Sequence, residues 1–283
     1  MEDGSLFSIH LFEGELRINR YIMAESNRCR RLNVLKIGGI CIGVFLRDQK
    51  TMALLHDFAV RKEDLSEMRD RAIKTVELDE EDLQLIRRTY TEDIPFYSAE
   101  YNVLAGLISG RLHVNGRAVF HGVSFLWNNK AWILTAPSGT GKTTQYYHWK
   151  ELYGDRVRIL NGDKPVLQVL DQGTVLVHPS PWNGKERLGC METAELGGII
   201  YLRQGQQNHV ERMRPEQAVR PILFQFITFL KDAEQVHALC RIEETILRNI
   251  PVWSMTNRGD RASAVLLHDT LGQYLRGNDK YGI

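Results

Sequence analysis

The chain has 283 residues, of which 43% are hydrophobic and 25% charged, a composition typical of globular proteins. This excludes a disordered chain, a collagen-like protein and a small disulfide-rich scaffold, and the length suits one large domain or two modest ones. Lysine and arginine (36) nearly balance aspartate and glutamate (35), so no global field draws the protein to nucleic acid or an anionic membrane.

Cysteine usage and the N-terminal residues indicate a cytoplasmic protein. No C-x-x-C pair or His-Cys cluster suggests zinc or a disulfide framework, and reduced thiols are expected at Cys29, Cys41, Cys190 and Cys240. Residues 1–10 carry acidic side chains and do not resemble a signal peptide. Apolar runs such as residues 37–46 are far shorter than the ~20 residues of a membrane-spanning helix.

The first part of the chain is predicted to be a small α+β domain, residues 1–105. Apolar, β-favouring runs predict strands over residues 5–12, 32–46 (broken at Gly38-Gly39) and 51–60. Residues 61–110 are helical in pattern. Asp79 is expected to cap a helix containing Leu83, Ile86 and Tyr90, and a second helix is expected over residues 97–108, ending at Gly110.

Two β-hairpins are predicted after this domain. Residues 112–114 and 118–120 flank Asn115-Gly116, a pair that tolerates the positive φ angles of a tight turn. A second hairpin joins residues 123–127 to the apolar strand 131–134 through a turn at 128–130.

The rest of the predicted second domain, residues 106–283, alternates strands and helices. Strands are expected over 157–160, 166–170, 175–177, 198–202 and 252–255. Helices are expected over 215–230, with the apolar run 222–230 in its core, and over 234–249 and 260–275. Arg258 and Asp260 precede the last helix as a cap with a nearby charge.

The most informative segment is residues 136–144, which read Ala-Pro-Ser-Gly-Thr-Gly-Lys-Thr-Thr after the strand 131–134. This fits the P-loop, with Ala136 where the usual pattern opens with Gly, and a helix expected to follow. In this reading backbone N–H groups near Gly139 and Gly141 surround phosphate oxygens, Lys142 binds the β and γ phosphates, and Thr143 ligates Mg²⁺. The predicted nucleotide-binding residues are Ser138, Gly139, Thr140, Gly141, Lys142, Thr143 and Thr144. The alternative is a glycine-rich turn with an incidental lysine.

A P-loop needs a second carboxylate to hold Mg²⁺ or to accept the proton of the phosphate acceptor. The strand at 157–160 ends in Asn161-Gly162-Asp163-Lys164, which makes Asp163 the candidate. An ordinary turn aspartate beside Gly162 and Pro165 is the alternative.

These residues carry a family resemblance. His121-Gly122-Val123, the loop with Lys142 and then Asp163 occur in the order and rough spacing seen in HPr kinase/phosphorylases, over about residues 112–170. The loop also resembles that of phosphoenolpyruvate carboxykinases, which share the fold. The resemblance implies an α/β protein in which an HPr kinase/phosphoenolpyruvate carboxykinase-type P-loop domain follows the small α+β domain. It further implies that Asp163 is the general base, that His121 orients it, and that the protein forms a homo-oligomer.

The sequence departs from that family at two places. Either Lys164 stands where the family has its second aspartate or Gly162 stands where it has its first, so the roles of base and metal ligand would merge on Asp163. The phosphorylase signature is degenerate at 186–189, so phosphorolysis is not expected. The chain is more similar to divergent HPr-kinase-like kinases of ribosomal peptides or small hydroxylated metabolites, which share a Pro-Trp-x-Gly-Lys stretch, here residues 181–185.

The sequence allows two possible roles for each of five further residues. Lys185 either contacts phosphate or substrate, or is a solvated turn lysine, and Trp182 is either a loop anchor or a wall of the substrate pocket. Basic side chains further on either clamp an acidic substrate or form a solvated rim: Arg203, Arg212 and Arg214.

The predicted function is therefore transfer of the γ-phosphoryl group of ATP to a hydroxyl, on a serine of a peptide or protein or on a small metabolite. Lys142, Asp163 and His121 are the predicted catalytic residues, and Thr143 and Asp163 the predicted Mg²⁺ ligands. No nucleic-acid or membrane partner is expected. The main alternative is a nucleotide-binding regulator or peptide-binding protein without phosphotransfer, which Lys164 favours. A decarboxylating carboxykinase and an ATPase motor fit the residues less well.

Overall fold

The computed structural model describes residues 8–12, 15–19, 32–61, 64, 73–89 and 94–278. The chain divides into unit 1, residues 1–112, and unit 2, residues 113–283. The boundary expected at residue 105 lies inside helix α4 (Phe96–His113). Strands and helices alternate along much of the chain, and the predicted α/β class is confirmed at that level.

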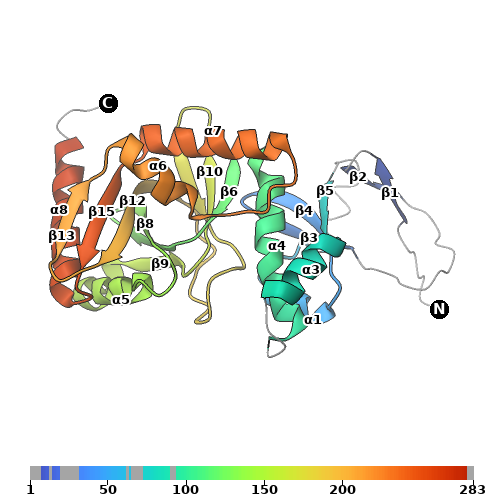
Figure 1. Ribbon diagram of the computed structural model, residues 1–283, viewed down its shortest axis with the longest axis horizontal. Helices are drawn as coiled ribbons and strands as arrows, with labels where there is room; N and C mark the ends of the chain where they lie inside the picture. The colour runs from blue at the N-terminus through green and yellow to red at the C-terminus, as the bar shows by residue number, and fades with distance from the viewer. Residues whose placement is uncertain are drawn as a thin grey trace. The chain divides into compact units, whose positions relative to one another are not determined.

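The described residues of unit 1 form a five-stranded sheet in the order β1-β2-β5-β4-β3 (Figure 1). Its strands are β1 (Ser8–Phe12), β2 (Glu15–Asn19), β3 (Leu32–Ile37), β4 (Ile40–Phe45) and β5 (Ile73–Glu77). Strands β4 and β5 are parallel, and the other neighbours are antiparallel. Gly38 and Gly39 form the turn between β3 and β4 with positive φ angles, which confirms the expected break. Residues 5–7, Cys29 and Tyr90 lie outside the described residues.

The strand expected over residues 51–60 is wrong. The segment forms α1 (Gln49–Leu55) and a short 3-10 helix, η1 (His56–Phe58). The Asp48 side chain caps α1 by accepting a hydrogen bond from the Lys50 N–H at 2.8 Å, and the buried Thr51 hydroxyl donates to Glu100 of α4. This long-range contact outweighs the local β preference of the segment.

Of three other predictions for residues 61–113, one is confirmed and two are wrong in part. Strand β5 lies within the stretch expected to be helical. Helix α3 (Glu80–Thr89) begins after Asp79, whose carboxylate accepts a hydrogen bond from the Asp82 N–H at 2.9 Å, so the predicted cap is confirmed. Helix α4 runs past Gly110 to His113.

The hairpin expected over residues 112–120 is also wrong. Leu112 and His113 are buried within the last turn of α4, and Asn115-Gly116 connects that helix to strand β6 (Arg117–Phe120). Gly116, with φ +68°, donates its N–H to the His113 carbonyl at 2.9 Å. The positive φ angle expected at Gly116 is confirmed, but the turn connects a helix to a strand instead of joining two strands.

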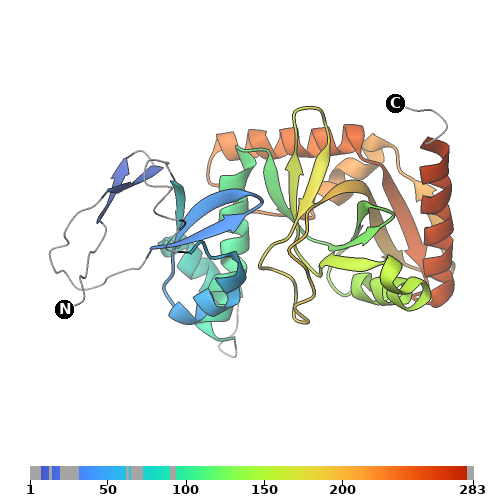
Figure 2. The same cartoon turned by 180° about the vertical axis from the view of Figure 1, so that it is seen from behind.

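Unit 2 contains a ten-stranded sheet among the described residues. Its main path is β14-β6-β10-β11-β12-β8-β7-β9, and β12 also pairs with β15, which pairs with β13. The strands besides β6 are β7 (Val123–Trp127), β8 (Lys130–Thr135), β9 (Arg158–Asn161), β10 (Val166–Val169), β11 (Val175–His178), β12 (Ala194–Gln204), β13 (His209–Arg212), β14 (Phe226–Ile227) and β15 (Val252–Asn257). The long β12 is parallel to both β8 and β15, and its N-terminal end pairs with β11 (Figure 2).

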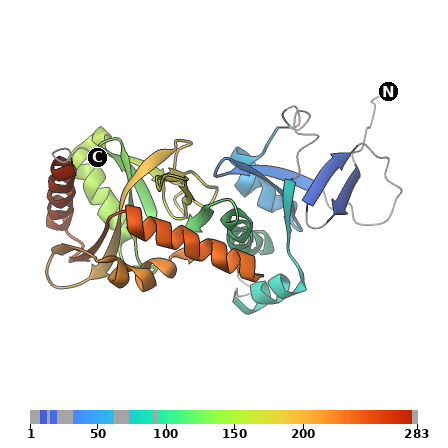
Figure 3. The same cartoon turned by 90° about the horizontal axis from the view of Figure 1, so that it is seen from above.

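Helices cover both faces of the central strands of this sheet. On one face, α5 (Lys142–Tyr153) and α8 (Arg261–Asn278) pack on Trp132, Leu134 and Ile200. On the other, α6 (Pro215–Leu223) and α7 (Ala233–Asn249) pack on Ile133 and Ile199, and Figure 3 shows these two helices together. Successive strand residues point to opposite faces, and both faces of these strands are buried, so they are apolar throughout.

The expectations for unit 2 are confirmed more often than those for unit 1. Hairpin β7–β8 forms as predicted, with Asn128 and Asn129 at φ 55° and 59° in its turn. The expected strands and helices at 157–202 and 234–275 are present with shifted ends. The helix expected over 215–230 is wrong beyond Leu223, because residues 226–227 pair with β6 as β14. Strand β13 was not predicted.

No helix in the described ranges is long and apolar enough to cross a lipid bilayer. Within the same ranges Cys190 and Cys240 are free thiols.

Candidate functional site

The glycine-rich loop, residues 136–141, lies between the end of β8 and the start of α5. Gly139 (φ +79°) and Gly141 (φ +103°) adopt left-handed backbone conformations that other residues rarely accept. Gly141 is the N-cap of α5, and no side chain caps this helix. The first amides of α5 therefore keep their hydrogen-bonding capacity for an anion, which the positive end of the helix dipole also attracts.

Lys142, the first residue of α5, lies across this loop. Its ammonium donates to the backbone carbonyls of Ala136 (3.0 Å) and Pro137 (3.3 Å), and the residue is only 8% exposed. Burial lowers the pKa of Lys142, while the charge of Asp163 opposes this effect. The predicted phosphate-binding lysine is thus held inside the loop by weak neutral acceptors that a phosphate oxygen can replace.

His121 and Asp163 approach this lysine from two other strand ends. His121 lies between β6 and β7, and Asp163 follows β9. The His121 Nε2 atom is 3.6 Å from the Asp163 Oδ1 atom, and Lys164 forms an ion pair with the other oxygen of Asp163. His121 and Asp163 are therefore in contact, and the charge of Lys142 acts on both, although residues 121, 142 and 163 are about twenty positions apart in sequence.

The surroundings of His121 favour its neutral form. Burial and the positive charge of Lys142 lower the pKa of His121 below its usual value, with a smaller contribution from Lys164. The Asp163 carboxylate and a hydrogen bond to Gln225 act in the opposite direction. At neutral pH a neutral imidazole beside an aspartate can orient that carboxylate without adding a positive charge to it.

A network of backbone contacts holds His121 in place. Its N–H donates to the Gln225 carbonyl (2.7 Å), its carbonyl accepts from the Thr135 hydroxyl (2.6 Å), and its Nδ1 atom is 3.3 Å from the Gln225 Oε1 atom. The next residue, Gly122, donates its N–H to the Asp163 carbonyl at 2.8 Å. A Cβ atom at Gly122 would lie 2.7 Å from an Ile133 methyl group, so only glycine allows this approach.

Asn161 shapes the turn that carries Asp163. Its buried side-chain oxygen accepts from the N–H groups of Asp163 (2.9 Å) and Lys164 (2.8 Å), and its amide donates to the backbone and hydroxyl oxygens of Ser180. This is an Asx-type turn. Sequence reasoning missed Asn161 as a positioning residue, although Asn-Gly-Asp is a composition that signals such turns.

Gln225 and Thr135 were missed for a different reason. Gln225 is 104 residues from His121, and it comes close only because β14 pairs with β6. Thr135 ends the strand before the glycine-rich loop, and a threonine there is ordinary in a strand. No local signal in the sequence marks either residue.

The loop after β11 folds beside Asp163. Trp182 is 1% exposed, and its carbonyl accepts from the Lys164 N–H at 2.9 Å, so it anchors the loop instead of lining an open pocket. At Gly184 (φ +83°) an added Cβ would lie 3.3 Å from the Asp163 Cβ atom. Lys185 is exposed, and Glu186 accepts a hydrogen bond from Tyr147 of α5. The same loop therefore contacts both the Asp163 turn and the first helix of the site.

Of the three arginines further along the chain, two lie over aromatic rings and the third precedes a helix. The Arg212 guanidinium lies 5.0 Å from the ring centre of Trp253, and that of Arg203 lies 5.6 Å from the ring centre of Tyr201. Arg214 is the N-cap of α6. Asp260 accepts from the Ser263 N–H at 3.0 Å at the start of α8, as the predicted cap requires.

The predicted Mg²⁺ ligands supply two hard oxygen donors. No group of three or more histidine, cysteine, aspartate or glutamate side chains in the described part of the chain is arranged to hold a metal ion. Mg²⁺ bound with nucleotide phosphates commonly takes only one or two protein ligands and completes its shell with phosphate oxygens and water. The Thr143 hydroxyl and the Asp163 carboxylate fit that pattern.

Comparisons with known proteins give a distant structural likeness. No protein-family model matches the chain, and no curated protein matches its sequence. Among solved structures, the chain is similar to the Hpr(Ser) kinase/phosphatase from Coxiella burnetii, with 8% identity and a TM-score of 0.36, over 58% of this chain and 93% of that chain.

Proposed function

We propose that this protein is an ATP-dependent kinase of the HPr-kinase-like type, which transfers the γ-phosphoryl group to a hydroxyl of a peptide, protein or small metabolite. The observation that carries the proposal is the contact of His121 with Asp163 within electrostatic range of Lys142, at a glycine-rich loop with uncapped helix amides. A phosphate loop, a buried lysine and a carboxylate are the parts that phosphoryl transfer requires.

In the proposed reaction the amides of the glycine-rich loop and of the first turn of α5 bind the β and γ phosphates. Lys142 exchanges the carbonyls of Ala136 and Pro137 for phosphate oxygens, where its charge stabilises the transition state. Mg²⁺, held by Thr143 and Asp163, would neutralise charge on the bound phosphates.

Asp163 is proposed to accept the proton of the acceptor hydroxyl as that oxygen bonds to the γ phosphorus. The bond between the γ phosphorus and its bridging oxygen breaks, and ADP leaves with that oxygen. His121 acts as a positioning residue, because its Nε2 atom faces Asp163 while Gln225 and Thr135 hold the rest of the residue. Lys185, exposed on the adjacent loop, is the proposed contact to acceptor or phosphate.

The second candidate is a regulator that binds nucleotide without chemistry. The ion pair between Lys164 and Asp163 favours it, since the lysine occupies one oxygen of the proposed base. The two candidates share nucleotide binding and differ only in transfer to an acceptor.

Calorimetry with ATP, ADP and GTP, with and without Mg²⁺, tests the shared part. Lys142→Ala is expected to weaken ATP binding about 10- to 100-fold, because a charge-assisted contact is lost. Lys150→Ala is the matched control, since Lys150 lies at the other end of α5 in an exposed ion pair with Asp155. No ATP binding by the wild type, or equal binding by both variants, would refute the site.

Transfer of labelled phosphate from ATP to serine peptides and small alcohols then separates the two candidates. Asp163→Asn is expected to bind ATP and to lose transfer. Binding by the wild type with no transfer to any acceptor, and no turnover of ATP, would favour the regulator.

A further inference from the structure

Arg203 lies at the same edge of the sheet as the glycine-rich loop. Strands β8 and β12 are parallel neighbours, and Tyr201 pairs with Thr135, the last residue of β8. Beyond that pair the chain leaves β8 for the glycine-rich loop, whereas β12 continues to Gln204. Arg203 therefore stands two residues past the pair, beside the start of the loop. In sheets of this kind, ligands bind outside the carboxyl ends of the parallel strands.

The side chain of Arg203 lies on the face of the sheet that carries the contacts of His121. Along β12, Tyr201 packs on the α6–α7 side, and side chains two residues apart share a face. In agreement with this alternation, the Arg203 guanidinium lies 5.6 Å from the ring centre of Tyr201. Thr135 faces the same side, since its hydroxyl contacts the His121 carbonyl and the Gln225 side chain at 2.6 and 3.2 Å.

A series of neighbouring residues connects Arg203 to the proposed base. Arg203 lies over Tyr201, which pairs in the sheet with Thr135. Thr135 binds the carbonyl of His121, whose imidazole contacts Asp163. Because neighbouring strands lie about 4.8 Å apart, Arg203 is a single strand spacing from the strand that leads into the glycine-rich loop.

Among the described residues, no carboxylate pairs with the exposed side chain of Arg203. Positions 204–208, which follow it, carry no charge. Asp260, which follows the end of the neighbouring strand β15, is engaged by other groups: it accepts from the Asn208 amide at 2.8 Å and pairs with Arg258 at 3.4 Å. Arg203 is thus a cation without an anionic partner at the edge of the sheet where the phosphates are expected.

We propose that Arg203 binds the γ-phosphoryl group of ATP, from the face of the sheet opposite to α5. The inference rests on the proposed function and adds a phosphate-binding residue to it. The planar guanidinium donates two parallel hydrogen bonds to non-bridging oxygens of the γ phosphate, and its charge stabilises the group during transfer. No bond to Arg203 forms or breaks. Lys164 does not supply this charge, because it is paired with Asp163.

Calorimetry on the full-length protein with ADP and with the non-hydrolysable ATP analogue AMP-PNP, both with Mg²⁺, tests the inference, because only the analogue carries a γ phosphate. Arg203→Gln is expected to weaken AMP-PNP binding at least about tenfold and to change ADP binding by less than about threefold. Arg203→Lys is expected to recover only part of the AMP-PNP affinity, since an ammonium keeps the charge without the planar fork.

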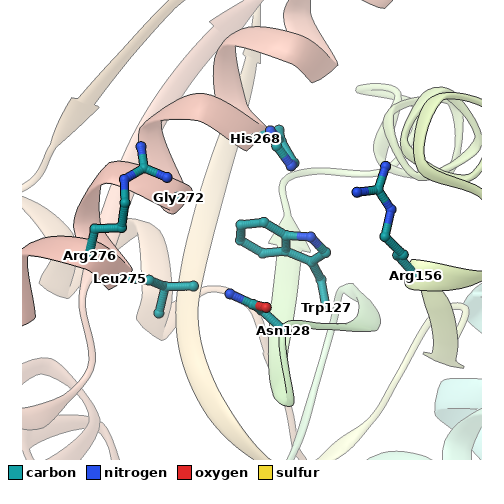
Figure 4. A pocket seen from close by; sticks show the side chains of 7 residues that line it. All are labelled: Trp127, Asn128, Arg156, His268, Gly272, Leu275 and Arg276. Carbon is teal, nitrogen blue, oxygen red and sulfur yellow. The ribbon is translucent and has the colours of Figure 1, made fainter. Parts of the chain in front are cut away.

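Arg276→Gln is the matched control. Arg276 is also exposed, and it lies near the end of α8. Figure 4 shows it beside a cavity that Arg156 also lines, just after the end of α5 and far from the glycine-rich loop. Both nucleotides should bind this variant as they bind the wild type. Urea midpoints of all variants should stay close to that of the wild type, because exposed side chains are replaced, so lost affinity does not reflect unfolding.

The other outcomes overturn the inference in distinguishable ways. Equal losses of ADP and AMP-PNP affinity in Arg203→Gln would give the arginine a structural role. Unchanged AMP-PNP affinity in this variant would remove Arg203 from the site and leave the proposed function standing. A wild type that binds neither nucleotide would overturn the inference and the proposed function together.

Discussion

Some residues of the candidate site can be proposed from local sequence patterns, and others cannot. Lys142 and Thr143 belong to a contiguous motif whose chemistry requires each residue at a fixed spacing, so the amino-acid sequence alone is enough to propose them as site residues. Asp163 could be proposed because a strand end followed by a turn is also a local pattern. Gln225 could not, since its contact with His121 depends on the pairing of β14 with β6, which no local pattern encodes.

His121 and Asp163 are expected to contribute unequally to turnover. Asp163→Asn removes the proposed base and should abolish transfer, whereas His121→Ala should lower kcat about 10- to 100-fold, because it removes only orientation of that base. Burial and Lys142 lower the pKa of His121, which favours the neutral imidazole at pH 7, so the wild-type rate should depend little on the titration of this group above pH 7. Steady-state kinetics from pH 6 to 9 measures both effects.

Two results would contradict this assignment of roles. One is an Asp163→Asn protein with a normal transfer rate. The other is a His121→Ala protein whose loss of rate is as large as that of Asp163→Asn. Gln225→Ala should reproduce a smaller part of the His121→Ala defect, since it releases the imidazole without removing it.

Single elements show where local sequence patterns are sufficient and where they are not. The β7–β8 hairpin was predictable because its two asparagines accept the positive φ angles of the turn and both strands are apolar. Residues 51–60 were mispredicted because the buried hydrogen bond of Thr51 to Glu100 fixes a helix there. The end of α6 was mispredicted because residues 226–227 add to the sheet edge beside β6.

Helix α7 carries a buried carboxyl group that makes stability depend on pH. Glu243 is 6% exposed on the packed face of α7, and its Oε1 atom has no hydrogen-bond partner among the described residues. Burial raises the pKa of Glu243 to about 7 from 4.5. Between these values the folded protein holds a proton that the unfolded chain has released, so this group makes the protein less stable as the pH rises.

Glu243→Gln is therefore expected to raise the free energy of unfolding by about 2 kcal/mol at pH 8 and to change it little at pH 4.5. Urea unfolding at the two pH values measures the difference. Glu244→Gln is the matched control, since this exposed neighbour pairs with Arg248 and should change stability by less than about 0.5 kcal/mol. Equal effects of Glu243→Gln at both pH values would show that the carboxyl does not titrate in this range.

At the scale of the whole molecule, the chain divides into two compact units, and every residue of the candidate site belongs to unit 2. The α/β class could be read from the alternation of strands and helices. The branched order of the sheet could not, because it depends on β12 pairing with strands from three parts of the chain.

A chain of residues 113–283 is consequently expected to fold by itself and to bind ATP with an affinity within about threefold of that of the full chain. Circular dichroism during heating and calorimetry with ATP measure the two properties. A fragment that shows no cooperative unfolding would mean that unit 2 needs unit 1 to fold. A folded fragment without ATP binding would place part of the nucleotide site in unit 1.

Helix α5 joins the glycine-rich loop to the aromatic core of unit 2. It begins at Lys142 in the glycine-rich loop and ends at Tyr153, whose ring stacks on His268 of α8. A helix of this length is a stiff rod of about 18 Å, so the packing at its C-terminal end helps to fix the direction of the amides at its N-terminal end. The convergence of the loop amides on an anion therefore depends on aromatic contacts at the far end of the helix.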